Sequence, residues 1–294
     1  MKQQSHNFTG VAHLVLAVRD MDACRILYGG ELGLAELESG RDGEGRRICM
    51  FGVGPSILEL REEIARPTAA ETLLPIVDHY ALLVEDMAQT YDLLRQKNIE
   101  FRAPPEATSI GHRNMQRILL SFDDPNDTTV QISETIDPRP HLDGRKAAKS
   151  HMAASAAAVP GLFGGIDHIS TYCADFASTR AFFREILGLE EFFHSTTREE
   201  GARVGADFAQ SAFSVGGTDI ELATGDGERT LGWGSIRELS FWSTDVDRTF
   251  QILEARGAPL DGPPAAWHPL PRVTRRAFSL HSPDGLPVRI AQPC

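Results

Sequence analysis

Four apolar, strand-like segments of the chain each carry a potential metal ligand at the same register. The ligand-type residues are His13, His79, His168 and Glu238, and an aspartate follows each of them seven positions later. A polar side chain that recurs at one register of an apolar strand needs a partner, because burying it unpaired costs about 1–3 kcal/mol. A metal ion on which these side chains converge would be such a partner.

A second polar side chain recurs toward the end of each repeat, again between apolar residues. The four are Glu59, Gln131, Glu221 and Arg289. Imidazole, carboxylate and amide groups together suit a borderline divalent ion such as iron, manganese, cobalt, nickel or zinc. The pattern therefore predicts one divalent metal ion, held by residues from the first and the last strand of a repeat.

Each repeat predicts a strand, a helix and then three further strands. The first strands are expected at residues 11–18, 77–84, 166–173 and 236–243, and the helices at 20–28, 86–97, 175–187 and 245–256. In the second and fourth repeats the next strand is expected at 99–102 and 258–261, ahead of a Pro-Pro pair. The aspartates that open the helices are better explained as helix caps than as catalytic groups. The predicted fold class is α+β, with four tandem βαβββ modules paired into two domains whose curved mixed sheets enclose a cavity.

Similarities among the repeats suggest how the modules pair. The first and third share a Leu-Gly-Leu helix end and the second and fourth share the Pro-Pro turn, which indicates duplication of a two-module unit. We therefore expect an N-terminal domain at 8–136, a Pro-, Ala- and Ser-rich linker at 137–164 and a C-terminal domain at 165–294. Within the N-terminal domain, four side chains would then converge on one metal ion: His13, Glu59, His79 and Gln131.

Length and composition indicate an ordinary globular protein. The chain has 294 residues, of which 41% are hydrophobic and 24% charged. Its net charge of −12 argues against nucleic acid or an anionic membrane as a partner. The four cysteines form no Cys-x-x-Cys pair, and no apolar run suggests a leader or a membrane span, so we expect a cytoplasmic protein.

This combination of repeats resembles the vicinal oxygen chelate superfamily, which includes glyoxalase I, methylmalonyl-CoA epimerase, fosfomycin-resistance proteins and extradiol ring-cleaving dioxygenases. The resemblance covers nearly the whole chain outside roughly the first ten residues and the linker. It implies metal binding by a His or Gln on the first strand and a Glu on the last strand of each module. Carried over to this sequence, the ligands are His13, Glu59, His79 and Gln131, where Gln131 stands in a position that many members fill with Glu.

The second half of the chain departs from that pattern. His168, Glu221 and Glu238 occupy ligand positions, but Arg289 occupies the fourth. A guanidinium would be repelled by a divalent ion and can instead form charge-assisted hydrogen bonds with Glu221 and Glu238. We therefore expect these four residues to form a degenerate second site.

Another arrangement of the modules stays open, since some four-module members of the superfamily pair module 1 with 4 and module 2 with 3. That pairing would assemble His79, Gln131, His168 and Glu221, a plausible metal set that resembles the epimerase pattern. The long linker and the duplicated unit favour sequential pairing instead.

Three kinds of function are compatible with these residues. The first is a metal-dependent lyase or isomerase of glyoxalase or epimerase type, in which the ion binds adjacent substrate oxygens and Glu59 moves the proton. The second is an extradiol-type dioxygenase, with His13, His79 and Glu59 on Fe(II) and Gln131 unligated. The third is a metal-free small-molecule-binding or resistance protein. The four-ligand set favours the first.

His112 and Arg113 are the candidate substrate-binding residues. They precede the third strand of the second module, where they could overhang the cavity and bind an anion. A solvated loop is the simpler alternative. The expected partner is a small-molecule substrate, and the protein is expected to be a monomer or a homodimer.

Overall fold

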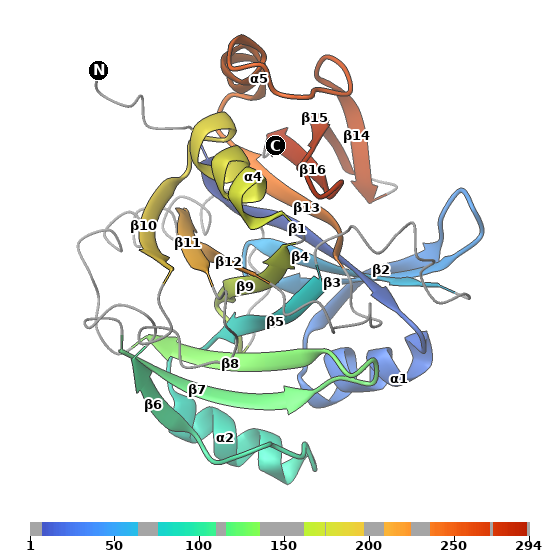
Figure 1. The fold of residues 1–294 in the computed structure, drawn as a ribbon. Coiled ribbons are helices and arrows are strands. Elements are labelled where there is room, and N and C mark those ends of the chain that lie inside the picture. The colour runs from blue at the N-terminus through green and yellow to red at the C-terminus, as the bar shows by residue number, and fades with distance from the viewer. Residues whose placement is uncertain are drawn as a thin grey trace.

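The fold was obtained as a computed structural model, which describes residues 8–63, 76–109, 116–135, 162–173, 175–196, 209–224, 236–270 and 273–292. Within these ranges the elements follow the predicted order of four modules, each with a strand, a helical segment and three more strands (Figure 1). The expected α+β class and the tandem βαβββ organisation are confirmed.

The elements of the four modules have the following bounds. Module 1 contains β1 (Phe8–Val18), α1 (Met21–Arg25), η1 (Ile26–Glu31), β2 (Ala35–Arg41), β3 (Arg47–Val53) and β4 (Ser56–Glu62). Module 2 contains β5 (Ile76–Leu83), α2 (Met87–Gln96), β6 (Glu106–Ser109), β7 (Gln116–Asp123) and β8 (Thr129–Thr135). Module 3 contains β9 (Gly165–Cys173), α4 (Phe176–Ala181), η3 (Phe182–Ile186), β10 (Glu190–Ser195), β11 (Gln210–Val215) and β12 (Thr218–Thr224). Module 4 contains β13 (Ile236–Ser243), α5 (Val246–Ala255), β14 (Ala265–Leu270), β15 (Val273–His281) and β16 (Pro287–Gln292).

The strands form two eight-stranded mixed sheets, each made from two modules. Sheet A has the order β14-β15-β16-β13-β1-β4-β3-β2, and sheet B has the order β10-β11-β12-β9-β5-β8-β7-β6. Antiparallel pairing of the first strands joins the modules, β1 with β13 in sheet A and β5 with β9 in sheet B (Figure 1). Sheet A therefore combines modules 1 and 4, and sheet B combines modules 2 and 3.

This sheet order corrects the sequential pairing expected from the sequence. Modules 1 and 2 do not share a sheet, and each half of the chain contributes one module to each sheet. The physical reason is that every module offers the same kind of unpaired edge on its first strand, so local sequence does not specify which module covers it. The similarity that indicates a duplicated two-module unit therefore does not tell which modules share a sheet.

The four predicted helix caps are present. The side chains of Asp20, Asp86, Asp175 and Asp245 each accept a hydrogen bond from a backbone N–H in the first turn of the following helix. Such a bond satisfies one of the donors that a helix leaves open at its N-terminus. These aspartates cap their helices and take no part in the candidate sites.

The strands expected at 99–102 and 258–261 are displaced toward the C-terminus. The edge strands of the two modules are β6 and β14, which begin after the Pro-Pro pairs rather than before them. The two prolines of each pair carry no N–H group for a strand ladder, so regular pairing resumes only beyond them.

Two glycine turns bring the sheets into close contact. Gly54, between β3 and β4, has φ +55°, and a Cβ on it would lie 2.3 Å from the Gly164 carbonyl oxygen ahead of β9. Gly216, between β11 and β12, has φ +60°, and its Cβ would lie 2.0 Å from the Thr9 carbonyl oxygen on β1. One hairpin turn of each sheet therefore lies against the first strand of a module in the other sheet or the residue just before it, and only glycine fits at these two positions.

The core is continuous across the modules. One cluster of buried apolar side chains includes Leu58, Leu82, Phe213 and Leu253, one from each module. The free thiols of Cys24 and Cys49 are buried, and burial raises the pKa of each to about 12, so neither is a nucleophile. Among the described residues, no helix combines the length and the apolar character that a membrane crossing requires.

Candidate metal centre

The shared register of the modules brings four ligand-type side chains together on sheet B. Ala81 on β5 pairs with both Gln131 on β8 and His168 on β9, and His79 lies two residues before it on the same face. Glu221 on β12 pairs with Ser170, two residues after His168 on the same strand. Four strands therefore present one side chain each to a common point, which we call the sheet B site.

The donor atoms of this site lie close together. His79 Nε2 is 3.0 Å from His168 Nε2, and His168 Nε2 is 3.2 Å from Gln131 Oε1. The ligand atoms of His79, His168 and Glu221 all lie within 4.8 Å of one another, and within the described ranges no other group of three metal-ligating side chains does so. Two imidazoles, a carboxylate and an amide oxygen can hold a borderline divalent ion.

The ring orientation of His168 fits a metal ion. His168 Nδ1 lies 2.9 Å from Asp167 Oδ2 and 3.2 Å from Arg117 Nη1. An ionised carboxylate can only accept, so the shorter contact places the proton on Nδ1 and leaves the Nε2 lone pair facing the site. Gln131 Oε1, another acceptor, faces that lone pair. With the proton on Nδ1, both atoms present lone pairs to the same point, which is the arrangement that two ligands of one metal ion have.

The spacing of the donors gives a second test of fit. Donor atoms bound to one ion at about 2.1 Å and at right angles to each other lie about 3 Å apart. The separations of 3.0 and 3.2 Å agree with that spacing. The residues present therefore fit a divalent metal ion.

A buried arginine contacts the residues around the sheet B site. Arg117, on β7, has no exposed surface, and its Nη2 donates to Asp219 Oδ2 at 2.8 Å. Its Nε lies 3.3 Å from Asp167 Oδ2, and its Nη1 lies 3.5 Å from Glu221 Oε1. Burial would lower the pKa of Arg117, but the three carboxylates raise the pKa by more than burial lowers it, so the guanidinium keeps its charge.

The carboxylate of Glu221 is ionised at neutral pH. Burial alone would raise its pKa, but His168, Arg117 and His79 outweigh that effect and hold the pKa below its ordinary range. Glu221 is therefore available as an anionic ligand or as a base.

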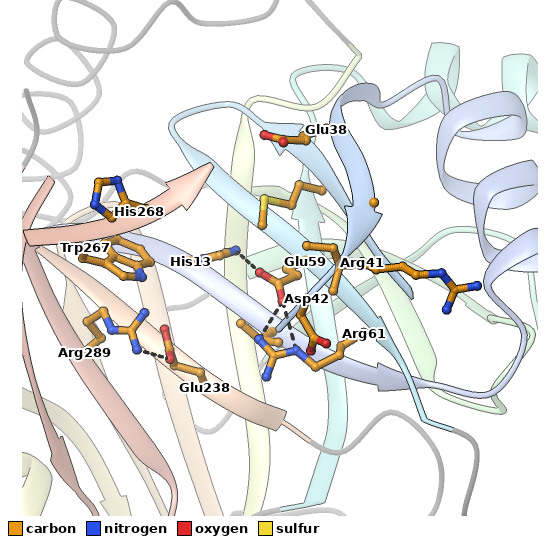
Figure 2. Close-up of a pocket in the computed structure, with 14 residues that line it drawn as sticks. His13, Glu38, Arg41, Asp42, Glu59, Arg61, Glu238, Trp267, His268 and Arg289 are labelled. Atoms are coloured by element: carbon orange, nitrogen blue, oxygen red, sulfur yellow. Dashed lines mark hydrogen bonds and ion pairs between the residues drawn. The ribbon is translucent and has the colours of Figure 1, made fainter. Parts of the chain in front are cut away.

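Sheet A carries the equivalent positions of modules 1 and 4, and they line a cavity of about 370 Å³. Figure 2 shows the side chains that line it. His13 Nε2 lies 3.3 Å from Glu59 Oε2, and Arg61 Nη2 donates to Glu59 Oε1 at 2.7 Å. Arg289 Nη2 lies 2.8 Å from Glu238 Oε2. We call this cavity the sheet A pocket.

The structure does not bring the two predicted residue sets together. Of the expected ligands, His79 and Gln131 lie in the sheet B site, whereas His13 and Glu59 lie in the sheet A pocket. The expected degenerate set is divided in the same way, with His168 and Glu221 on sheet B and Glu238 and Arg289 on sheet A. The set that does assemble belongs to the alternative pairing: His79, Gln131, His168 and Glu221.

Two further expectations also change. Glu59, the expected proton-moving group, lies on the other sheet from His79 and His168, so it has no access to the cluster that fits a metal. Arg289 contacts Glu238 as expected, but Glu221 is contacted by Arg117 instead. The candidate substrate-binding residues His112 and Arg113 lie outside the described residues.

The supporting residues Arg117, Asp167 and Asp219 were not found by sequence reasoning. The available signals were an arginine inside the apolar run of β7 and an aspartate directly before His168. An aspartate also directly precedes His79, and β3 and β15 also contain arginine, so these signals did not distinguish the supporting residues from ordinary strand residues.

Comparisons with known proteins agree with the fold. The family model described as Glyoxalase/Bleomycin resistance protein/Dioxygenase superfamily matches residues 10–132 and 165–289. A putative dioxygenase from Bacillus subtilis superposes with a TM-score of 0.66 at 16% identity, over 98% of this chain and 86% of that one. Glyoxalase I from Zea mays superposes with a TM-score of 0.62 at 16% identity, over 96% of this chain and 92% of that one. No curated protein matches the sequence significantly.

Proposed function

Because the chain belongs to the glyoxalase/bleomycin resistance protein/dioxygenase superfamily, we propose that the sheet B site is the metal centre of a lyase or isomerase of glyoxalase or epimerase type. Its substrate is a small molecule that binds through two adjacent oxygen atoms. One observation carries the proposal: four donors from four strands meet at one point with the spacing of a shared ion.

The four side chains have separate tasks in this proposal. His79, Gln131, His168 and Glu221 hold the ion, and Asp167 fixes the His168 ring so that Nε2 faces it. When bound, a divalent ion supplies Lewis-acid polarisation of the substrate oxygens. His79 is only partly buried, in contrast to His168, so the side of the site next to His79 is where substrate enters.

Glu221 is the residue that moves the proton. Its carboxylate is anionic, and it accepts a proton from the substrate carbon next to the chelating oxygens and returns it to the neighbouring carbon or to the same carbon. Arg117 beside it keeps Glu221 ionised between these transfers. The reaction therefore needs no oxidant.

The test is an isotope experiment on the metal-loaded protein. A panel of α-hydroxycarbonyl compounds and 2-oxo acids is incubated in D₂O, and exchange of the α-proton is followed by proton NMR. We expect exchange with wild type, and loss of about a hundredfold or more in Glu221→Gln at equal metal content, because the substitution removes the base but keeps an oxygen donor of the same shape. Glu238→Gln is the matched control on sheet A. Equal exchange in Glu221→Gln and wild type would exclude Glu221 as the base.

An extradiol-type dioxygenase is the second candidate, and a specific observation favours it. The three donor residues that lie within 4.8 Å of one another are two histidines and one carboxylate, the set that non-haem Fe(II) oxygenases use. In that function Gln131 hydrogen-bonds but does not bind the ion. Oxygen consumption by the iron-loaded protein with catechols, undiminished in Gln131→Ala, would establish this function and displace the first.

A further inference from the structure

The sheet A pocket has the features of a binding site in its own right. It encloses about 370 Å³ and is lined by side chains of modules 1 and 4 (Figure 2). That volume is within the range of small-molecule sites. Its ligand-type residues His13, Glu59 and Glu238 are all among the described residues, yet they form no cluster with the spacing of a metal site.

A guanidinium occupies one of the four ligand-type positions of this pocket. Arg289 stands at the register position that Gln131 and Glu221 fill on sheet B, and it neutralises Glu238. Its Nε donates to Ser279 Oγ at 3.3 Å, and its guanidinium carbon lies 4.6 Å from the centre of the Trp267 ring. A cation fixed on three sides by a carboxylate, a hydroxyl and an indole is positioned rather than mobile.

The pocket also holds a buried imidazole without a hydrogen bond. His13 is only 2% exposed and lines the cavity, yet among the described residues neither Nδ1 nor Nε2 makes a hydrogen bond. Nε2 lies 3.3 Å from Glu59 Oε2, within ion-pair distance, so Nδ1 is the nitrogen without a polar contact to a described residue. Leaving such a group unpaired costs about 1–3 kcal/mol, so a partner delivered by a ligand is expected here.

The free hydrogen-bonding capacity of the pocket selects an anion. The carboxylate oxygens of Glu59 and Glu238 already face Arg61, His13, Ser240 and Arg289. By contrast, the Nη1 groups of Arg61 and Arg289 make no hydrogen bond to any described residue. Asp42, which also lines the pocket, pairs with Arg46. Glu38 has no ion pair with a described residue, and in Figure 2 it lies away from Arg289. Two arginine donors of the pocket lining are therefore available to a ligand that supplies acceptors.

We propose that the sheet A pocket binds a small aromatic carboxylate without any metal ion. The carboxylate accepts hydrogen bonds from Arg289 Nη1 and Arg61 Nη1, and the His13 ring contributes a further polar contact. The planar body of the ligand packs on Trp267 and Met50, which supply an aromatic and a sulfur-containing surface. This site is separate from the sheet B site and does not depend on the function proposed there.

The test uses benzoate as the probe and isothermal titration calorimetry on the full chain, with benzylamine and benzyl alcohol as charge controls. We expect benzoate to bind, and the two controls to bind at least tenfold more weakly. Arg289→Gln should weaken benzoate binding at least tenfold, whereas Arg276→Gln, which removes an exposed arginine paired with Asp247, should not change it. Because Arg289→Gln could also disturb folding, Trp267→Leu is measured as a second variant, with circular dichroism on each.

Chelation separates this site from sheet B. Benzoate affinity should be the same in protein stripped of metal with EDTA and in His168→Ala. Loss of binding in either case would place benzoate on sheet B and overturn the proposal. Tighter binding of benzylamine than of benzoate, or no binding of any probe, would also overturn it.

Discussion

His168 illustrates how one side chain is prepared for its task by its neighbours. Asp167 accepts from Nδ1, Arg117 pairs with Asp167, and Nε2 is left to face His79 and Gln131. A ligand whose tautomer is fixed before the ion arrives loses less freedom on binding. The supporting residues are therefore as important to the site as the ligands.

Asp167→Asn should weaken metal binding without removing a ligand. A neutral amide is a poorer acceptor for His168 Nδ1–H, and loss of such a support typically costs about ten- to a hundredfold in metal affinity. The affinity can be measured by competition with a chromophoric chelator. Asp175→Asn, which changes an exposed helix cap, is the control. Unchanged affinity in Asp167→Asn would show that the His168 tautomer does not matter.

Glu59 makes the stability of sheet A depend on pH. Burial would raise its pKa, but contact with His13 and pairing with Arg61 outweigh it, so the pKa lies below the ordinary value of 4.5. A carboxyl whose pKa is lowered by folding stabilises the fold at pH values above its pKa in the unfolded chain. This contribution is lost as the pH falls through its pKa in the folded protein. The stability advantage of wild type over Glu59→Gln should therefore shrink below pH 4.5.

Urea unfolding at neutral pH and at about pH 3.5 measures this difference. An advantage that stays constant across the two pH values would contradict the account of Glu59.

At the level of elements, the hairpin turns at Gly54 and Gly216 hold the two sheets together. Gly216→Ala should destabilise the protein more than Gly45→Ala does. Both glycines have positive φ, so each substitution carries a backbone cost of about 1–2 kcal/mol. Only at Gly216 would the new Cβ also collide with a carbonyl oxygen, because nothing lies within 4 Å at Gly45. The difference in stability loss between the two variants, measured by thermal unfolding, gives the cost of the collision. Equal losses of stability would mean that β1 moves aside without cost.

Element types could be predicted from the sequence because they depend on local patterns. Apolar alternation marked β1, β5, β9 and β13, and an aspartate after each strand marked the helix that follows. The edge strands β6 and β14 lie C-terminal to the predicted strands, because each begins after its Pro-Pro pair rather than ending before it. The ligand positions followed from the same repeats, although their grouping did not.

At the scale of the whole molecule, the halves of the chain are interlocked. Each sheet needs one module from each half, so His79 and Gln131 come from the first half and His168 and Glu221 from the second. The pairing of the first strands, β1 with β13 and β5 with β9, joins segments that lie far apart in the sequence. Such contacts leave no periodic signal in the sequence, which is why the pairing could not be predicted.

Separated halves test this interlocking directly. Fragments 1–136 and 162–294, each refolded alone, should bind no divalent metal tightly, since neither contains the full set of ligands. Mixing the fragments should give a complex with one copy of each, and this complex should bind metal. Size-exclusion chromatography with metal analysis measures both. Stoichiometric metal in fragment 1–136 alone would instead support a site made of modules 1 and 2.

The most direct test of the central claim is the metal content of the purified full chain, measured by plasma mass spectrometry in wild type, His168→Ala and His13→Ala. The structure predicts about one divalent ion per chain in wild type and in His13→Ala, and almost none in His168→Ala, because only His168 belongs to the cluster that fits a metal. Loss of the ion in His13→Ala with retention in His168→Ala would contradict the assignment of the metal centre to sheet B.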